Sequence, residues 1–404
     1  MTTTHPLDRT STGTGTPSRR PGRRRWGATL IAAAFVIAAC GGDDDAPVTT
    51  PAATDVDDSE DGELDADADE GAAPADRTVR LVAYDSFPVS GTSLNDAFDD
   101  FTAETGIAVE IVSAGDTGAM VTKAVLTAGT PEGDVLWGID NTFLSRALDG
   151  DVFEPGVLAD DHPDLVSIPA ELRALAPAGE VVPVDVGDVC VNVDLGWFAE
   201  RDLDPPTTFD DLIDPAYADL LVVQDPGSSS PGLAFVLATI ATYGEDGWLD
   251  WWSALRDNGV EVTSGWTEAY YERFTWAGGG PRPLVVSYAS SPPAEVLFAD
   301  PPRDDAPTGV MEQTCFRQVE FAGVLRGTPE PEAAAALLEF LISPTFQAEL
   351  PLNLFVYPAN ADVELPDVFV EHTVVPDAPL GVDPALIEAN RTAWIDAWTD
   401  TVVG

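Results

Sequence analysis

Aromatic, acidic and hydroxyl side chains gather in six short segments of the chain, and most of these segments directly follow a run of apolar residues. The segments are YDSF (84–87), GDTG (115–118), GIDN (138–141), DPGSSSPG (225–232), GWTEAY (265–270) and SYASSP (287–292). Aromatic faces attract a cation, a carboxylate pairs with it, and hydroxyl groups donate hydrogen bonds to a polar group. These residue types favour the binding of a small ligand without any bond being made or broken.

The groups that a secreted hydrolase needs are missing from these segments. The chain has three histidines, His5, His162 and His372, and none of them lies in the six segments. The run SSSPG also departs from the G-x-S-x-G nucleophile elbow, because Pro231 stands where glycine is required. The sequence therefore predicts no catalytic residue, no cofactor and no metal site.

Alternating strands and helices must position the six segments. Strands are predicted over 79–84, 109–113, 134–137, 181–193, 220–223, 260–263, 284–288 and 318–325, and helices over 94–105, 119–128, 141–148, 231–243, 248–257, 267–276, 332–342, 345–350 and 384–398, with a short helix after Pro292. This alternation predicts an α/β fold with mixed, mostly parallel sheets covered by helices. The tryptophans at 248, 251 and 252 are expected to be a helix packing face and not a ligand cage.

The order of the elements predicts two lobes. The first lobe comprises residues 78–187, the second comprises 188–316, and residues 317–404 return to the first lobe and end in C-terminal helices. The long strand at 181–193 and the strand at 318–325 would be the two crossovers that act as a hinge. Ligands of open α/β folds bind at the carboxyl ends of strands, so the cleft between the lobes is the predicted binding site.

Cys40 ends the run IAAC, which follows an arginine-rich stretch and a short apolar segment. Residues 26–39 are too few to span the roughly 30 Å of a bilayer core as a helix. The sequence therefore predicts a lipoprotein signal peptide at 1–39 and a lipidated Cys40. Residues 40–77 lack large apolar side chains and are rich in Asp, so we expect an acidic, disordered linker. The predicted protein is exported and lipid-anchored, on the outer face of the cytoplasmic membrane or in the periplasm.

The two remaining cysteines, Cys190 and Cys315, both lie in strand-like runs. In an exported protein an isolated pair favours a disulfide over a metal site, because no further soft ligand is near in sequence. Two buried, unpaired thiols are the alternative.

The charge of the chain excludes some partners. The net charge is −51, and residues 1–39 contribute six Arg and one Asp, so the remainder carries about −56. Such a surface repels nucleic acid, and we expect a monomer that binds no nucleic acid.

Nine segments together resemble a known family. YDSF, GxDN, VPVDVGD, QDPGSSSPG, GWTEAY, SYASSP, ISPTFQ, VYPAN and RTAWIDAW follow one another, over residues 78–401, in the order and spacing found in thiamine-binding substrate-binding proteins of ABC importers. The resemblance implies a type II periplasmic-binding fold and closure of two lobes on thiamine or its mono- or diphosphate. It also implies delivery to an ABC permease with a separate ATPase.

The resemblance also implies which residues bind the ligand. These are Tyr84, Asp116, Thr117 and Asp140 in the first lobe, Ser229, Trp266, Tyr288, Ala289, Ser290 and Ser291 in the second, and Phe355 near the C-terminus. Phe355 stands where the family has a tryptophan, so one stacking wall is smaller. Thiamine joins an aminopyrimidine to a cationic thiazolium, which Trp266 and Tyr288 could face and Asp116 could pair with. The same fold with ferric iron, a polyamine or a sulfonate as ligand is the alternative.

Overall fold

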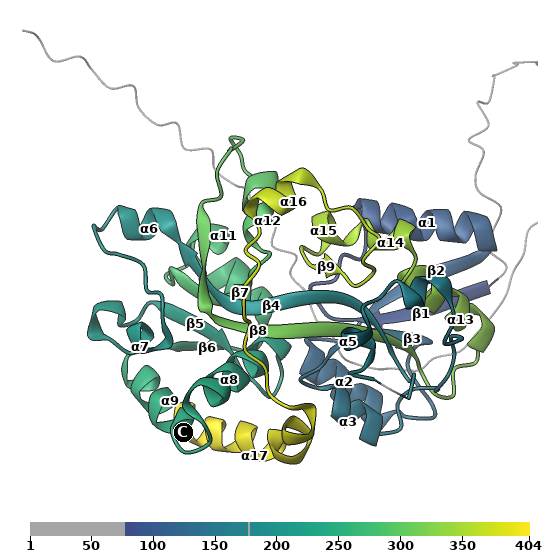
Figure 1. Cartoon of the computed structure of the whole chain (residues 1–404), viewed down its shortest axis with the longest axis horizontal. Coiled ribbons are helices and arrows are strands. Elements are labelled where there is room, and N and C mark those ends of the chain that lie inside the picture. Colours follow the sequence, from purple (N-terminus) through teal and green to yellow (C-terminus); the bar gives the residue numbers. More distant parts are fainter. Residues whose placement is uncertain (1–76, 177) are drawn as a thin grey trace, which may run out of the picture. The chain divides into compact units, whose positions relative to one another are not determined.

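The strands of the described residues join into one mixed sheet (Figure 1). The computed structural model describes residues 77–176 and 178–404. The strands are β1 (Arg77–Ala83), β2 (Ile107–Ser113), β3 (Val135–Asp140), β4 (Val182–Asp194), β5 (Leu221–Gln224), β6 (Glu261–Thr263), β7 (Leu284–Tyr288), β8 (Thr308–Val324) and β9 (Tyr357–Pro358). Their order is β2-β1-β3-β8-β4-β7-β5-β6, and β9 pairs with β4.

Strand direction changes along the sheet. The β1–β2, β1–β3, β5–β6 and β5–β7 pairs at the two ends are parallel, whereas β4 and β8 are antiparallel to each other and to their outer neighbours. We predicted mixed, mostly parallel sheets, and the antiparallel pairs lie at the centre of the sheet. They arise because the two predicted crossover strands run side by side through the middle of the molecule (Figure 1) and join the two ends into one sheet.

Helices cover the faces of each end of the sheet. The first lobe, around β1–β3, carries α1 (Ser93–Thr105), α2 (Thr117–Leu126), α3 (Leu144–Asp149), α4 (Pro163–Val166), α5 (Ala170–Arg173), α13 (Pro331–Leu341), α14 (Pro344–Gln347) and α15 (Leu350–Asn353). The second lobe, around β5–β7, carries α6 (Leu195–Ala199), α7 (Phe209–Leu212), η1 (Pro215–Tyr217), α8 (Ser230–Tyr243), α9 (Trp248–Asp257), α10 (Trp266–Glu268), η2 (Ala269–Arg273), α11 (Thr275–Gly278) and α12 (Pro292–Leu297). The chain ends with α16 (Asp367–His372) and α17 (Pro384–Val402).

Local sequence explains where these helices begin and end. α1 starts in a capping box of Thr92 and Asn95 and stops at Gly106, whose φ of 72° is left-handed. α8 begins at Ser230 with a proline in its first turn, and its side chains from Ser230 to Ile240 are buried. Proline is tolerated there because the first-turn N–H groups have no helical partner. The beginning of α8 is therefore fixed at the edge of the second lobe.

The predicted helix over 267–276 is wrong in detail. The chain forms α10, a π-helical turn (η2), an extended Phe274 and then α11. Phe274 forms a β-bridge with Arg282, and backbone hydrogen bonds join the flanking Arg273 and Thr275 to Arg282. Pairing with this returning segment replaces the helical hydrogen bonds, so a continuous helix cannot form.

The tryptophans of α9 pack as predicted. Trp251 and Trp252 are buried, and Trp252 meets Trp398 of α17 edge to face with ring centroids 5.4 Å apart. α17 also reaches the first lobe, where Arg391 donates to Ser145 of α3 at 2.8 Å. The C-terminal helix thus contacts both lobes (Figure 1).

Cys190 of β4 and Cys315 of β8 form a disulfide, as predicted. Both residues are buried where the two crossover strands enter the second lobe. The predicted signal peptide, the lipidated Cys40 and the linker up to residue 76 lie outside the described residues. Within the described part of the chain, no helix has the length and hydrophobicity needed to cross a bilayer.

Candidate functional site

A cavity of about 480 Å³ lies between side chains from both lobes. The first lobe contributes residues after β1, at the start of α2 and at the end of α15, and the second contributes residues of α8, α10, η2, α11 and α12 and the end of β7. The lining consists of Tyr84, Ser86, Asp116, Thr117, Pro231, Trp266, Tyr270, Tyr271, Trp276, Ala277, Tyr288, Ser291, Ala294, Glu295, Phe298, Ala299, Asp300, Glu320, Asn353, Leu354, Phe355 and Val356. Such a volume suits a small organic ligand.

Aromatic rings form one wall of the cavity. Trp266, the first residue of α10, stacks on Tyr270 with centroids 4.9 Å apart and 16° between the planes. The Tyr288 ring at the end of β7 lies 6.5 Å from the Trp266 ring. The indole N–H of Trp266 donates to the Ser287 hydroxyl at 3.0 Å, which fixes the ring. The wall therefore offers flat, oriented faces to a planar or cationic group.

Asp116 joins the two lobes. It is the N-cap of α2, where it accepts a hydrogen bond from the Thr117 N–H at 2.7 Å, and its other oxygen accepts from the Trp266 N–H at 3.1 Å. Burial raises the pKa of Asp116 to about 6, although these two backbone bonds oppose the rise. The carboxylate is thus desolvated and lies beside the aromatic wall.

Glycines let the lobes come this close. A Cβ at Gly265 would lie 2.8 Å from the Asp116 Oδ2, and one at Gly118 would lie 2.6 Å from the Gly227 carbonyl oxygen. The Gly118 N–H donates to the Ser228 carbonyl at 2.8 Å across the same junction. The glycines of the GDTG and GWTEAY segments are therefore required for contact between the lobes.

Two acidic side chains meet on the crossover strands. Asp185 of β4 is directly opposite Glu320 of β8, and both are buried. Asp185 accepts from the Trp137 indole N–H at 3.1 Å, and Glu320 accepts from the Gln318 amide at 3.2 Å. Burial, followed by the charges of neighbouring carboxylates, raises the pKa of Glu320 well above its usual value, and burial also raises the pKa of Asp185. Glu320 lines the cavity, and a cation bound there would favour its ionised form and so lower its raised pKa.

The structure brings seven of the predicted ligand-binding residues to the cavity. They are Tyr84, Asp116, Thr117, Trp266, Tyr288, Ser291 and Phe355. The Tyr84 ring lies so close to Gly138 that a Cβ at this position would clash with it, and the φ of Gly138, 103°, also favours glycine. Phe355 packs edge to face on Phe298 with centroids 5.8 Å apart. The smaller wall expected at Phe355 is thus supplemented by a phenylalanine from the second lobe.

Four predicted residues lie behind the lining and not in it. Asp140 is fully buried and accepts hydrogen bonds from the hydroxyls of Ser230 and Thr142. Ser229 stands at the N-cap position of α8 and is fully buried, as is Ser290. Ala289 packs against the disulfide. These four residues are buried next to lining residues of the same segments, so they support the site without lining it.

Sequence reasoning missed several lining residues. Tyr270, Tyr271 and Glu295 line the cavity, and the Tyr270 hydroxyl donates to Glu295 at 2.5 Å. A regular helix would place Tyr270 and Tyr271 about 100° apart, whereas both reach the cavity from the π-helical turn. Glu320 could have been recognised as a candidate, because it is a lone carboxylate in the otherwise apolar run VEFAGV.

A metal centre would need a cluster of ligating side chains. Within residues 77–176 and 178–404, no group of three or more His, Cys, Asp and Glu side chains is arranged to hold an ion. Burial and the neighbouring Glu295 raise the pKa of Tyr270 well above its usual value, which disfavours the phenolate that ferric iron binds. The described site is thus better suited to an organic cation than to a metal ion.

Residues 133–379 match the family model of bacterial extracellular solute-binding proteins. The chain belongs to this family. This solute-binding protein is 29% identical to the thiamine-binding periplasmic protein of Escherichia coli (strain K12) over 333 residues, which cover 80% of this chain and 93% of the relative. It is 24% identical to iron uptake protein A1 of Synechocystis over 67% of this chain and 74% of the relative.

A solved structure agrees with the sequence comparison. A periplasmic thiamin binding protein superposes on this solute-binding protein with a TM-score of 0.69 and 26% identity, over 80% of this chain and 96% of that one. The predicted two-lobed periplasmic-binding fold is therefore confirmed.

Proposed function

We propose that this protein captures thiamine in the cavity between its lobes and delivers it to an ABC importer. The observation that carries the proposal is that an oriented aromatic wall, Trp266 and Tyr288, lies beside the carboxylate of Asp116 in a cavity that Glu320 also lines. A thiazolium ring is flat and carries one positive charge. It would gain cation–π attraction of about 0.5–2 kcal/mol per ring and would pair with a carboxylate in the same place.

The similarity to thiamine-binding proteins supports the same ligand. Members of a solute-binding family bind and release their ligand unchanged, so we expect no catalysis. The partner would be a permease with a separate ATPase, and the diacylglycerol of Cys40 would keep the binding protein, as a monomer, near that permease. Counting acyl chains by mass spectrometry of the N-terminal peptide tests the anchor, and an unmodified thiol at Cys40 would contradict it.

Ferric iron is the second candidate, because Tyr270 and Tyr271 both line the cavity beside Glu295 and an iron uptake protein is among the relatives. The phenol of Tyr270 donates to Glu295, however, and its raised pKa opposes loss of that proton. Thiamine therefore fits the described side chains better than ferric iron does.

A calorimetric titration of the full chain, purified without refolding, tests the proposal. Thiamine is expected to bind at one site per chain, and ferric citrate and spermidine are expected to give no saturable heat. Saturable heat with ferric citrate or spermidine, and none with thiamine, would show that the site binds that other ligand and would contradict the proposal.

A further inference from the structure

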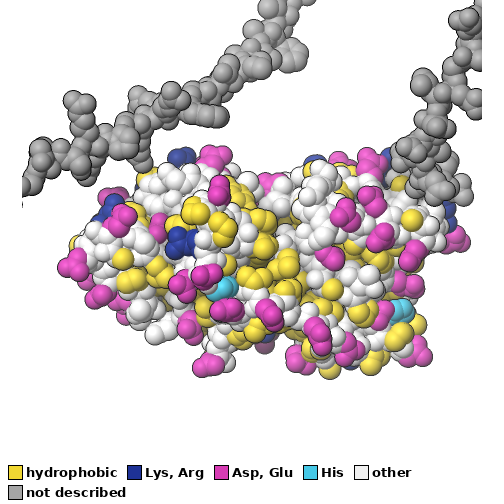
Figure 2. Space-filling model, turned by 90° about the horizontal axis from the view of Figure 1, so that it is seen from above, with side chains coloured by type: hydrophobic (Ala, Val, Ile, Leu, Met, Phe, Trp, Pro, Cys, Tyr) yellow, Lys and Arg dark blue, Asp and Glu magenta, His cyan; other side chains and the backbone are white. Residues whose placement is uncertain are grey.

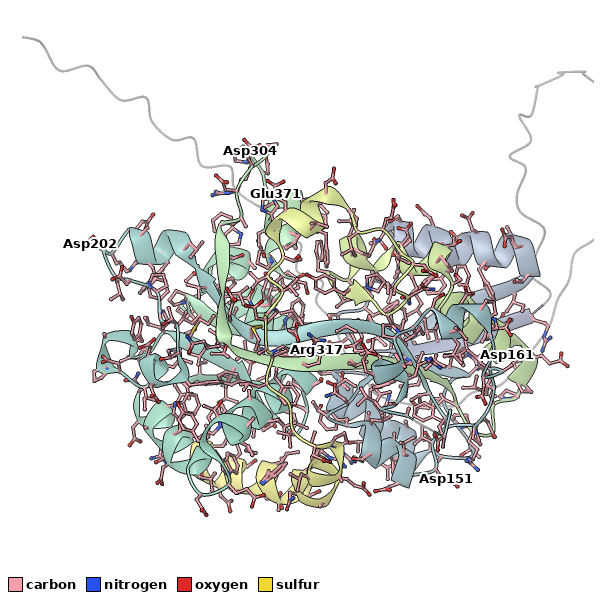
Figure 3. All side chains as sticks on the ribbon, viewed as in Figure 1. Asp151, Asp161, Asp202, Asp304, Arg317 and Glu371 are labelled. Carbon is pink, nitrogen blue, oxygen red and sulfur yellow. A yellow bond between two sulfur atoms is a disulfide. The ribbon has the colours of Figure 1, made fainter. Side chains whose placement is uncertain are left out.

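Gln318 lies behind the cavity, on a strand that crosses between the lobes. It belongs to β8 and is paired with Gly187 of β4, the other crossover strand. The residue before it, Arg317, is labelled near the centre of the molecule in Figure 3 and pairs with Asp188 at 2.6 Å on the more exposed face of the strand. Because successive side chains of a strand point to opposite faces, Gln318 points inward, and it is 1% exposed.

Both hydrogens of the Gln318 amide nitrogen are donated. One goes to the carboxyl group of Glu320 at 3.2 Å, and the other goes to the hydroxyl oxygen of Ser230 at 3.1 Å. Ser230 donates its own hydrogen to Asp140, so its oxygen accepts from the amide. The direction of the hydrogen bonds from Gln318 through Ser230 to Asp140 is therefore fixed, and the planar amide has one orientation that serves both acceptors.

These hydrogen bonds connect the cavity to a contact between the lobes. Glu320 lines the cavity. Ser230 is the first residue of α8 in the second lobe, whereas Asp140 ends β3 in the first lobe, where the hydroxyl and the N–H of Thr142 donate to it at 2.6 and 3.0 Å. The bond between Ser230 and Asp140 thus spans the two lobes and would break if they separated. Gln318 joins this bond to Glu320.

Gln318 also lies beside the aromatic wall. A Cβ at Gly187, its partner on β4, would lie 3.0 Å from the Tyr288 ring. Directly opposite residues of paired strands share one face of the sheet, so the Tyr288 ring lies on the face from which Gln318 projects. A ligand held against Tyr288 and Glu320 would therefore restrict the side chains on two sides of the Gln318 amide.

The two carboxyl groups at the ends of these hydrogen bonds differ from the carboxylates of the surface. Asp and Glu side chains are spread over the surface of both lobes in Figure 2. Asp140 and Glu320, in contrast, are 0% and 7% exposed. A buried carboxyl group is costly unless hydrogen-bond donors reach it. The bonds from Gln318 and Ser230 therefore stabilise the arrangement in which the lobes are in contact.

Building on the proposed function, we propose that Gln318 is a positioning residue that couples thiamine binding to closure of the lobes. Thiamine against Tyr288 and Glu320 fixes the amide of Gln318. The fixed amide presents its second N–H to Ser230 and so stabilises the bond between Ser230 and Asp140. Coupling is reciprocal, so closure that brings Ser230 to the amide also orients Glu320 for the ligand. Gln318 acts in this way without touching the ligand.

Calorimetric titration of the full chain with thiamine tests the coupling. Gln318→Met keeps a side chain of similar size but removes both N–H donors, and it should weaken thiamine binding by about tenfold. Ser230→Ala should weaken binding by a similar factor. Because both residues act in one series of hydrogen bonds, the double variant should also bind about tenfold more weakly than the wild type, whereas independent effects would multiply to about a hundredfold.

Hydrogen exchange, followed by mass spectrometry, reports on closure itself. The Gly118 N–H donates to the Ser228 carbonyl across the lobe junction at 2.8 Å. Thiamine should slow exchange of the peptide that contains Gly118 in the wild type, and Gln318→Met should reduce this slowing. Gln224→Met is the matched control, because Gln224 is also buried and its amide donates to the Val286 carbonyl at 2.9 Å, outside this series of hydrogen bonds. It should leave the affinity and the exchange at Gly118 unchanged.

The outcomes separate the two proposals. Unchanged affinity and exchange in Gln318→Met, a hundredfold loss in the double variant, or equal effects of Gln224→Met and Gln318→Met would each overturn the coupling and leave thiamine capture intact. If Gln318→Met does not fold, Ser230→Ala decides, and unchanged slowing of exchange at Gly118 in that variant would overturn the coupling. Absence of saturable heat when thiamine is added to the wild type would overturn the proposed function itself.

Discussion

Acidification should weaken thiamine binding, because Asp116 must lose its proton to pair with a cation. The pKa of this carboxyl is about 6 in the folded protein. If thiamine binds only when Asp116 is ionised, the observed Kd equals the Kd of the ionised protein multiplied by a factor. This factor is one plus the ratio of protonated to ionised Asp116 in the free protein. That factor is about ten at pH 5 and close to one at pH 7.5, so Kd should be about tenfold higher at pH 5. A proton lost from the Asp185–Glu320 pair would steepen the same trend.

Calorimetry at half-unit steps from pH 5 to 7.5 measures this dependence, and repeating each titration in a second buffer of different ionisation enthalpy counts the protons released. Asp116→Asn should flatten the profile and weaken binding at pH 7.5. Asp100→Asn, on the exposed side of α1, is the matched control and should leave the profile unchanged. A Kd that stays constant over this range, or falls on acidification, would refute the reasoning.

The same pKa shift has a consequence for stability. The pKa of Asp116 is raised from 3.8 to about 6 on folding, so the folded state holds a proton that the unfolded chain has lost between these values. The contribution of Asp116 to the free energy of unfolding is therefore full below about pH 4 and is lost as the pH rises through 6. Thiamine should restore stability most at the upper end of this range.

Three further changes test separate parts of the structure. Trp266→Ala should weaken thiamine binding by about tenfold or more while the melting temperature changes little. Trp266→Phe should keep part of the affinity. A large decrease in the melting temperature of Trp266→Ala would instead show that Trp266 belongs to the core. Gly118→Ala should weaken binding without unfolding the protein, because the new Cβ would lie 2.6 Å from the Gly227 carbonyl and hold the lobes apart; unchanged affinity by calorimetry would contradict this. Replacing Cys190 and Cys315 together by Ala should lower the free energy of unfolding by about 4–5 kcal/mol, since the disulfide closes a loop with a sequence separation of 125; urea denaturation that shows no change would disprove this contribution.

The elements that could be predicted from sequence are those whose pattern depends on local burial. β7 and α9 occur at their predicted bounds, because an apolar run in one case and an amphipathic pattern in the other follow directly from which faces are covered. The crossover strands were recognised for the same reason. Their antiparallel pairing was not, because it depends on contacts between residues more than a hundred positions apart.

The candidate site was predictable where residues follow a strand and project from its end, as Asp116, Trp266 and Tyr288 do. It was not predictable where long-range pairing reshapes the backbone. The bridge between Phe274 and Arg282 ends the helix early, and Tyr270 and Tyr271 reach the cavity from the π-helical turn before it. Glu320 stands out as a lone carboxylate in an apolar run, but the sequence does not show that its strand passes the cavity.

A crystal structure of the protein with thiamine tests the central claim most directly. The thiazolium is expected against the wall formed by the rings of Trp266 and Tyr288, with the carboxyl group of Asp116 or Glu320 within hydrogen-bonding or ion-pairing distance of the ligand. Thiamine bound elsewhere, or bound in the cavity with both rings turned away from it, would contradict the claim.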